Sequence, residues 1–304
     1  MIYALVSVYH PTKAMVSKIA TTIAQTDRTY ICDNSPSSHV KLFAPLIAEG
    51  CVEYVWFGEN LGLSQGFNRI LKNADYPWKP DDYVLFFDQD SSISPGHVKK
   101  LVSDFVQLKN KNYPIGCIGP LYYNTSSGRE EIPRSKKEIS HGIYAISSII
   151  TSSMLTTYEV LQQVGFWNEH IFLDMADWDL CWRIQKAEKL CCLTEKTILH
   201  HSIGNGEKRI GPLCLRVGAP FREYYQIRDS LYLLFQAYTP LKYRVRFCAM
   251  LLIRSPLHVI FLDHRKERFV YIFCGIRDFF CRKTGPLPEE KQIAIIEKHF
   301  RRRL

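Results

Sequence analysis

The chain has 304 residues, of which 46% are hydrophobic and 13% aromatic, enough for one large domain with or without a smaller appendage. No stretch reaches the ~18 uncharged apolar residues that a membrane-spanning helix needs. The opening Met-Ile-Tyr lacks the basic segment and apolar run of a secretory signal. We therefore expect neither a transmembrane nor a secreted protein.

The charge is distributed unevenly along the chain. Residues 1–205 hold 19 Lys and Arg against 21 Asp and Glu, and residues 206–304 hold 20 against 9, so all of the excess behind the net charge of +9 lies in the last third. A basic segment rich in aromatic residues suits a nucleic acid or an anionic lipid surface, and a solvated basic face has the same composition.

The ten cysteines include no Cys-x-x-Cys pair and no zinc-like spacing with histidine. They are scattered through apolar segments, such as the one around Cys248. We interpret them as small buried hydrophobic residues in a reducing compartment.

In chain order, the first half alternates between strand and helix patterns. Strands are expected at 3–8, 30–32, 52–57, 83–87 and from 116, and helices at 15–23, 64–71 and 98–108. This alternation predicts an α/β fold with a largely parallel sheet, in which ligands bind at the carboxyl ends of the strands.

The second half is less regular. Residues 125–140 predict a loop or an irregular hairpin, and strands are expected at 143–151 and 197–200. Helices are expected at 177–187 and 222–237, and basic amphipathic helices from Pro240 to the end of the chain.

Two carboxylates, Asp88 and Asp90, follow the apolar strand at 83–87. Such a pair can turn toward one hard cation, because Mg²⁺ and Mn²⁺ prefer oxygen ligands and bridge to substrate phosphates. The alternative is a solvated turn. The buried strand favours the cation, since it delivers the pair to the ligand edge of the sheet.

Asp33 ends an earlier strand, where its carboxylate can accept the imide N–H of a uracil or thymine ring. An Asx-turn before Pro36 explains the same residue equally well. The segment 60–68 places Gly62 and Gly66 around Ser64, a candidate N-cap, which lets the backbone approach a nucleotide. It is neither a phosphate-binding P-loop nor a dinucleotide fingerprint.

The segment 172–183 carries three carboxylates where a helix begins, a position that the helix dipole favours. Asp179 and Arg183 are expected to pair at i, i+4. Trp178 and Trp182 share that spacing and can form either an aromatic wall for a sugar or part of the core. At the end of the strand at 197–200, His201 can complete a metal site or be an ordinary surface or core histidine.

Taken in order, these motifs over residues 1–235 resemble the family-2 inverting glycosyltransferases of the GT-A fold. The motifs are Asp33-Asn34-Ser35, the segments 60–68, 88–90 and 165–179, and His201 to Gly204. Within that family the chain is most similar to the bacterial rhamnosyltransferases of surface-polysaccharide assembly. Ala176-Asp177 replaces the usual Glu-Asp pair, and Asp229 stands where some relatives have Asn.

The resemblance implies a catalytic domain over 1–238, with a nucleotide-sugar half at about 1–120 and an acceptor half at about 121–238, and a basic helical region over 239–304. It implies Mg²⁺ or Mn²⁺ as cofactor, held by Asp90 and Asp88 with His201, and Asp177 as the base. It assigns the acceptor to Asp174, Trp178 and Arg228, although a helix-surface role suits Arg228 as well. The nucleotide sugar is assigned to a larger set: Tyr9, Asp33, Asn60, Gly62, Gly66, Asn68, Asp88, Gln89 and Asp90.

The implied donor is dTDP-L-rhamnose or a UDP-linked sugar, and the implied acceptor is a lipid-linked glycan at the cytoplasmic face of a bacterial membrane. The basic tail is expected on an anionic membrane surface, or against the catalytic domain, or in a homodimer interface. A nucleic-acid-binding module is disfavoured because the sequence has no zinc finger, helix-turn-helix or RNA-recognition motif. A nucleotidyltransferase is disfavoured because residues 7–11 are not a glycine-rich basic loop.

Overall fold

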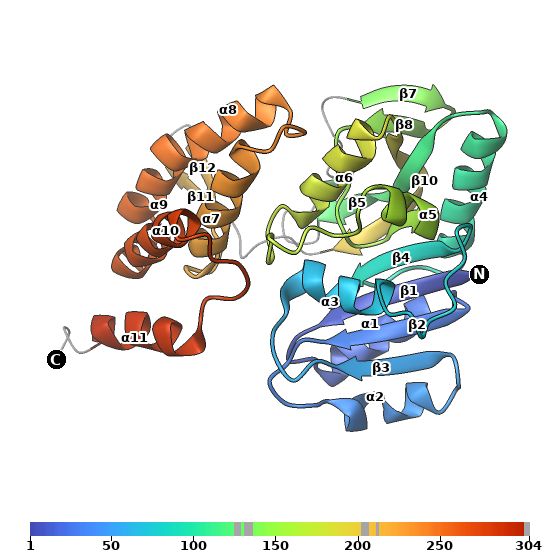
Figure 1. Cartoon of the computed structure of the whole chain (residues 1–304), viewed down its shortest axis with the longest axis horizontal. Helices are drawn as coiled ribbons and strands as arrows, with labels where there is room; N and C mark the ends of the chain where they lie inside the picture. The colour runs from blue at the N-terminus through green and yellow to red at the C-terminus, as the bar shows by residue number, and fades with distance from the viewer. Residues whose placement is uncertain (125–128, 131–135, 202–206, 211–212, 301–304) are drawn as a thin grey trace. The chain divides into compact units, whose positions relative to one another are not determined.

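A computed structural model of the chain describes residues 1–124, 129–130, 136–201, 207–210 and 213–300 (Figure 1). By its internal contacts the chain divides into two compact units. The first unit comprises 1–168 and 176–203, and the second comprises 169–175 and 204–304. The expected functional boundary at residue 238 stays a prediction, since contacts show which elements pack together and not which residues carry the activity.

The first unit is built around a ten-stranded mixed sheet of order β3-β2-β1-β4-β9-β5-β10-β8-β7, with β6 paired to β5. Its strands are β1 (Ile2–Val8), β2 (Arg28–Asp33), β3 (Val52–Trp56), β4 (Tyr83–Asp88), β5 (Ile115–Asn124), β6 (Arg129–Glu130), β7 (Lys136–Ser140), β8 (Ile143–Ile146), β9 (Met154–Thr157) and β10 (Leu190–His201). Its helices are α1 (Lys13–Ile23), α2 (Val40–Ile47), α3 (Gly62–Leu71), α4 (His97–Asn110), α5 (Tyr158–Gln163) and α6 (Ala176–Lys186).

The four N-terminal strands of the sheet, β3-β2-β1-β4, are all parallel, as the alternating pattern predicts. β9 then runs antiparallel between β4 and β5, and β10 runs parallel to β5. The sheet is therefore mixed, with a parallel half that carries the strands bearing the polar clusters.

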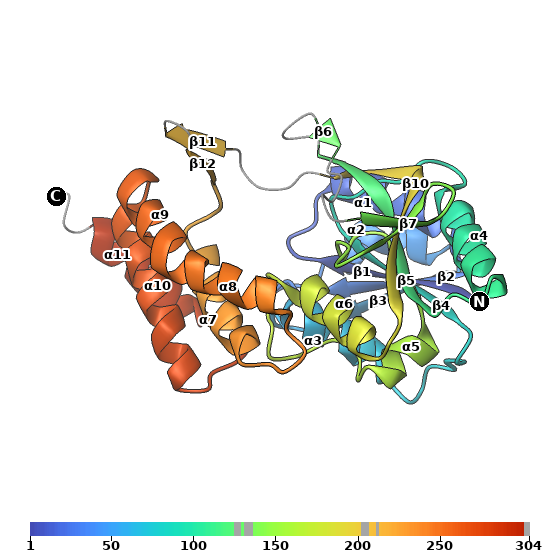
Figure 2. The ribbon, with the colours of Figure 1, turned by 90° about the horizontal axis from the view of Figure 1, so that it is seen from above.

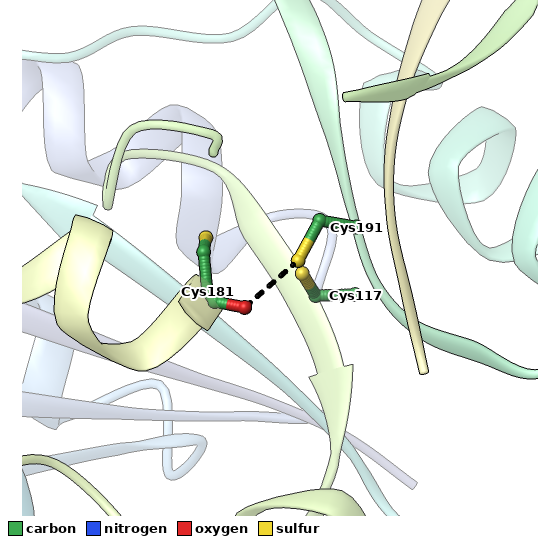
Figure 3. A group of neighbouring side chains, drawn as sticks. All are labelled: Cys117, Cys181 and Cys191. Atoms are coloured by element: carbon green, nitrogen blue, oxygen red, sulfur yellow. Dashed lines mark hydrogen bonds between the residues drawn. The ribbon is translucent and has the colours of Figure 1, made fainter. Parts of the chain in front are cut away.

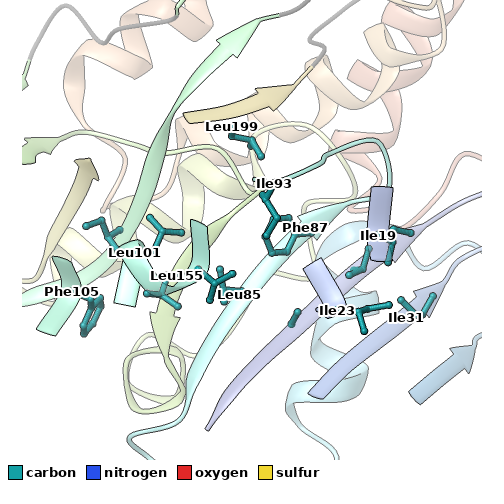
Figure 4. Packing of buried hydrophobic residues seen from close by; sticks show 14 of the residues in the cluster. Ile19, Ile23, Ile31, Leu85, Phe87, Ile93, Leu101, Phe105, Leu155 and Leu199 are labelled. Atoms are coloured by element: carbon teal, nitrogen blue, oxygen red, sulfur yellow. The ribbon is translucent and has the colours of Figure 1, made fainter. Parts of the chain in front are cut away.

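Apolar side chains fill both faces of this sheet, because successive residues of a strand point to opposite sides. Leu85 and Phe87 of β4 belong to a core cluster with residues of α1 and α4, such as Ile23 and Leu101 (Figure 4). On the opposite face Phe86 packs against Phe67 of α3, with ring centroids 4.9 Å apart. The prediction that the strand at 83–87 is central is confirmed.

The second unit is mainly helical, with α7 (Arg222–Leu234), α8 (Leu241–Ala249), the π-helical turn η1 (Met250–Arg254), α9 (Ser255–Phe261), α10 (Arg265–Phe280) and α11 (Glu289–Phe300), and the hairpin β11 (Glu207–Ile210) and β12 (Leu213–Arg216). Figures 1 and 2 show α10 beside α7 and α9. A small core of Phe172, Tyr224, Tyr225, Tyr271 and Leu287 joins these helices to the segment 169–175. Among the described helices, none is both long and apolar enough to span a bilayer.

Three expectations about local structure need correction. Ser64 is not an N-cap: α3 already begins at Gly62, and the Asn60 side chain accepts a hydrogen bond from the Gly62 N–H at 3.0 Å. The strand expected at 143–151 ends at Ile146. Cys248 is exposed, because α8 buries Tyr243 and Phe247 on another face. The expected loop at 125–140 falls largely outside the described residues.

Candidate active site

Two strand-end carboxylates lie at the same edge of the sheet. Asp33 ends β2 and pairs in register with Val8 of β1, and Asp88 ends β4 and pairs with Ser7 of β1. The two acidic motifs therefore lie on strands that are separated only by β1. The carboxyl edge of parallel strands is where ligands bind in open α/β sheets.

The side chain of Gln89 joins this edge to the loop after β1. Its Oε1 accepts from the Tyr9 N–H at 2.9 Å, and its Nε2 donates to the Tyr9 carbonyl oxygen at 3.0 Å. The Tyr9 side chain is 40% exposed beside this link. Gln89 thus holds the backbone of Tyr9, and the structure brings together two residues that are 80 positions apart.

Asp33 is fully buried and already has protein partners for both oxygens. Its Oδ1 accepts from the Ser35 N–H at 2.8 Å, and its Oδ2 accepts from the Tyr54 hydroxyl and faces His39 Nδ1 at 3.1 Å. Burial, with a contribution from Asp33, raises the pKa of Tyr54 to about 12. The Asx-turn expected as the alternative is present, and direct contact of Asp33 with a pyrimidine stays a prediction.

His39 and Tyr54 are the residues at this edge that sequence reasoning missed. Tyr54 lies inside β3 and His39 in the loop before α2, and no local pattern marks either one. The parallel pairing of β2 with β3 brings Tyr54 to Asp33, and the loop between β2 and α2 folds back to bring His39 there.

The segment before and within α3 is fixed by packing. Gly62 has φ +74°, a conformation that favours glycine. A Cβ on Gly66 would lie 3.3 Å from the side chains of Asn34 and Phe57. Asn68, 2% exposed, exchanges two hydrogen bonds with the backbone of Trp167, at 2.8 and 3.0 Å. These contacts give the residues of the motif a structural role in holding the start of α3. Their contact with the nucleotide stays a prediction.

The loop after β4 lies beside the end of β10. Ser92, two residues beyond Asp90, forms a β-bridge with His200, which directly precedes His201. Asp88 and Asp90 are both half-buried. The backbone of His201 therefore lies near the loop of the acidic pair, while its side chain falls outside the described part of the chain.

The two carboxylates at the start of α6, Asp177 and Asp179, differ in burial and in hydrogen-bond partners. Asp179 is fully buried and pairs with Arg183 at 2.7 Å, which confirms the expected i, i+4 pair. Asp177 is half-buried, and its Oδ1 accepts from the Trp178 N–H at 2.8 Å. Trp182 is 2% exposed and belongs to the core, whereas Trp178 is half-buried. Asp177 and Trp178 are thus partly accessible at the start of this helix, whereas Asp179 is not.

The remaining acceptor candidates lie in the second unit. Asp174 pairs with Arg222 at 2.7 Å. Arg228 is 2% exposed and pairs with the neighbouring Asp229 at 2.8 Å. The helix-surface role expected as the alternative for Arg228 is therefore wrong: its guanidinium is buried.

Three buried thiols form a separate cluster, with the sulfur atoms of Cys117, Cys181 and Cys191 within 4.8 Å of one another (Figure 3). Within the described residues this is the one group of three or more His, Cys, Asp or Glu side chains close enough to share a metal. Cys191 donates to the Cys181 carbonyl oxygen at 3.5 Å, and Cys181 donates to the Ile149 carbonyl oxygen at 3.9 Å. These bonds explain the cluster as buried thiol packing, as the sequence predicts.

Comparison with known proteins agrees with this geometry. Residues 19–158 match the family described as Glycosyl transferase family 2. A Shigella flexneri protein named dTDP-rhamnosyl transferase RfbF is 24% identical over 290 residues, which cover 91% of this chain and 95% of that protein. The crystal structure of GalNAc-T7 with UDP, GalNAc and Mn²⁺ superposes with a TM-score of 0.54 at 11% identity over 85% of this chain. This chain spans 57% of the length of that protein.

The mixed sheet, its acidic strand ends and these similarities define a glycosyltransferase of the GT-A fold. More narrowly, residues 19–158 are similar to the Glycosyl transferase family 2, and the rhamnosyltransferase relative is similar over most of the chain. The fold and enzyme class expected from the sequence motifs are confirmed.

Proposed function

We propose that this enzyme transfers L-rhamnose from dTDP-L-rhamnose, with inversion, to a lipid-linked glycan in the synthesis of a cell-surface polysaccharide. The main support for a nucleotide-sugar donor is the position of Asp33 and Asp88, which lie on either side of β1 at the carboxyl edge of the sheet. The choice of rhamnose follows the activity named for the Shigella flexneri relative, which matches 91% of this chain. A UDP-linked sugar is the second candidate, because the matched GalNAc-T7 structure contains UDP.

The residues after β4 fit a divalent cation. Asp88 and Asp90 supply carboxylate oxygens, which Mg²⁺ and Mn²⁺ prefer, and both side chains are partly accessible. The GalNAc-T7 structure was solved with Mn²⁺. Such a cation would neutralise charge on the leaving nucleoside diphosphate. Asp88 and Asp90 would hold it, with His201 as the proposed third ligand.

Asp177 is the proposed base. Its carboxylate takes the proton of the acceptor hydroxyl while that oxygen bonds to the anomeric carbon. The bond from this carbon to the diphosphate oxygen breaks in the same step, and the nucleoside diphosphate leaves. Attack from the opposite face inverts the anomeric centre and needs no enzyme nucleophile. The Trp178 N–H orients the Asp177 carboxylate through its bond at 2.8 Å.

The second unit is proposed to lie on the cytoplasmic face of a bacterial membrane. α10 exposes a stripe at i, i+4, i+7 and i+11, in which Phe269 and Phe273 are each 60% exposed, Ile276 is 36% and Phe280 is 76% exposed. Exposed cations, among them Arg265, Lys266 and Arg282, flank this stripe. Apolar side chains next to cations suit an anionic lipid interface.

A donor screen tests the function. The purified chain is incubated with Mn²⁺ and each of dTDP-rhamnose, UDP-glucose and UDP-N-acetylglucosamine, and thermal stabilisation and release of nucleoside diphosphate are measured. We expect dTDP-rhamnose to stabilise the protein most and to be turned over. Turnover of a UDP-linked sugar alone would contradict the rhamnose assignment, and no turnover of any nucleotide sugar would contradict the function.

A further inference from the structure

A cavity of about 260 Å³ lies in the second unit, where α10 ends beside α7. Three cationic side chains line it, together with one carboxylate and one phenyl ring: Arg228, Arg282, Lys283, Asp229 and Phe279. Its volume is close to the lower end of the range for small-molecule sites. The cations outnumber the carboxylate, so the cavity favours an anion.

Arg228 provides the fixed part of this cavity. Its Nε donates to Asp229 Oδ1 at 2.8 Å, and its Nη1 donates to the Gly285 carbonyl oxygen at 2.6 Å. Its Nη2 is buried and has no hydrogen-bond partner among the residues that the structure describes. A buried donor without an acceptor costs about 1–3 kcal/mol, and more for a charged group. An oxyanion in the cavity would supply that acceptor.

Asp229 offsets the charge of Arg228 alone, so Arg282 and Lys283 leave the cavity lining positive. Its Oδ1 is taken by Arg228, and its Oδ2 accepts from the Phe172 N–H at 3.2 Å. Lys283 lies in a long ion pair, 3.6 Å from Asp278, which also pairs with Arg277 at 2.6 Å. Arg282 and Lys283 are exposed at the mouth, where they can close on a ligand.

Aromatic side chains continue from the cavity onto the surface. Phe279 lines the cavity and stacks on Phe235, with ring centroids 6.0 Å apart at 12°. Phe235 is 71% exposed and Phe280 is 76% exposed. A ligand with an anionic head in the cavity can therefore lay an apolar chain on these rings.

We infer that this cavity binds the phosphate or diphosphate of a lipid, with the lipid chain leaving over Phe235 and Phe280. Arg228 fixes an inner phosphate oxygen, and Arg282 and Lys283 bind the outer ones, since guanidinium groups match phosphate geometry. That this lipid is the anchor of the sugar acceptor rests on the proposed function. The cavity is lined by residues of the second unit, whereas the donor motifs belong to the first unit.

Binding of three probes by calorimetry in EDTA tests the inference, because the chelator removes any cation from the donor site. The probes are farnesyl diphosphate, which has both parts of the ligand, inorganic pyrophosphate, which has only the charge, and farnesol, which has only the chain. The test variant is Arg282→Asn with Lys283→Gln; Asn tolerates the left-handed backbone of residue 282, where φ is 55°. The control is Lys242→Gln with Arg246→Gln, which removes the same charge from exposed positions of α8 in the same unit.

We expect farnesyl diphosphate to bind more tightly than pyrophosphate and farnesol. The test variant should weaken it at least about tenfold, as the loss of charge-assisted hydrogen bonds predicts, and the control should change it less than about twofold. Equal weakening in both variants would show unspecific attraction and overturn the site. Equal affinity for pyrophosphate and farnesyl diphosphate would contradict the inference that the ligand is a lipid.

Binding of dTDP with Mn²⁺ is measured on the same variants. We expect it to be unchanged in all of them, because the donor motifs lie in the first unit. Loss of farnesyl diphosphate binding with intact dTDP binding supports the inference whether or not rhamnose is the sugar. A chain that binds dTDP-rhamnose but no farnesyl diphosphate would refute the lipid site and leave the donor assignment standing.

Discussion

At the residue scale, Asp177 and Asp179 lie two positions apart on α6 and differ in burial and partners. Asp177 is half-buried, so Asp177→Asn should keep the fold within about 1 kcal/mol. It should lower transfer by about 10²–10⁴-fold, because an amide cannot take the acceptor's proton. Rates are measured with saturating donor, and donor binding by calorimetry. Near-normal turnover would remove Asp177 from the role of base.

Asp179→Asn is the matched change on the same helix. Asp179 is fully buried against Arg183, which also donates to the Val164 and Phe166 carbonyl oxygens. Removing one partner of such a pair leaves a buried charge and costs about 3–5 kcal/mol. Urea unfolding should show this loss in Asp179→Asn and not in Asp177→Asn. The opposite order of stabilities would contradict both assignments.

The acidic pair after β4 predicts metal dependence. EDTA should stop turnover, Mn²⁺ or Mg²⁺ should restore it, and Asp90→Asn should raise the metal concentration needed by about tenfold or more. Asp81→Asn is the control, because Asp81 is exposed and precedes β4 at the other end of the strand. Metal titrations of activity decide this. Full activity in EDTA would exclude the proposed metal site.

The sequence predicts the position of these residues in the sheet more accurately than it predicts their side-chain contacts. Asp33 and Asp88 could be placed at one edge because strand ends follow from hydrophobic pattern and parallel order. The contacts of Asp33 with Tyr54 and His39 could not, because they depend on side chains of a neighbouring strand and loop. For Arg228 the sequence leaves acceptor binding and a helix-surface role open, and only the fold shows that this side chain is buried.

At the scale of elements, one glycine determines how closely α10 approaches α7. A Cβ on Gly275 would lie 2.7 Å from the Tyr224 carbonyl oxygen and 3.2 Å from Ile227 Cβ. Gly→Ala inside a helix normally stabilises by about 1 kcal/mol. Here the clash should reverse the sign and destabilise by about 1–3 kcal/mol. Urea unfolding checks this, with Lys266→Ala at an exposed position of α10 as control. A more stable Gly275→Ala protein would contradict the packing.

The buried His97 at the start of α4 predicts a pH-dependent stability. Its Nε2 lies 2.7 Å from Ser153 Oγ and its Nδ1 lies 2.8 Å from Thr197 Oγ1. Burial, with a smaller effect of Lys100, lowers the pKa of His97 to about 4. An unfolded histidine titrates near 6.5, so the unfolded state binds more protons between pH 6.5 and 4. Stability is therefore present above pH 6.5 and lost as the pH falls toward 4.

The loss attributable to His97 between pH 7.5 and 5 should be about 2 kcal/mol. Urea midpoints at the two pH values measure it, with His97→Gln as the comparison, since a glutamine does not titrate. The variant should be less stable at pH 7.5 and should change less with pH. An identical pH dependence in both proteins would show that His97 is not responsible.

Element types followed from the sequence wherever the pattern was local. β1 to β4 and α1, α3 and α4 appear close to the expected ranges because each has its own apolar period. β9 was not predicted: its four residues, Met154–Thr157, pair with β4 and β5, both far away in sequence. A strand inserted antiparallel into a parallel sheet has no local signature, since the pairing that stabilises it is entirely non-local.

At the scale of the whole molecule, the charge gradient along the sequence and the exposed stripe of α10 predict membrane binding. The last third carries 20 Lys and Arg against 9 Asp and Glu. Each cation near an anionic surface contributes roughly 1 kcal/mol, and each buried phenyl side chain about 1.5–3 kcal/mol. The full chain should float with phosphatidylcholine vesicles that contain phosphatidylglycerol at physiological salt, and it should bind pure phosphatidylcholine vesicles more weakly.

Replacing Phe269, Phe273 and Phe280 together by Ser should weaken vesicle binding at least about a hundredfold, by the loss of apolar burial. Because these side chains are exposed on α10, the variant should keep its helical circular dichroism and its binding of dTDP. The control replaces Val40 and Val106, exposed apolar residues of the first unit, by Ser. If the wild-type chain stays with the unbound fraction, the membrane proposal fails. A variant whose mass in solution falls to half would instead identify the stripe as a dimer interface.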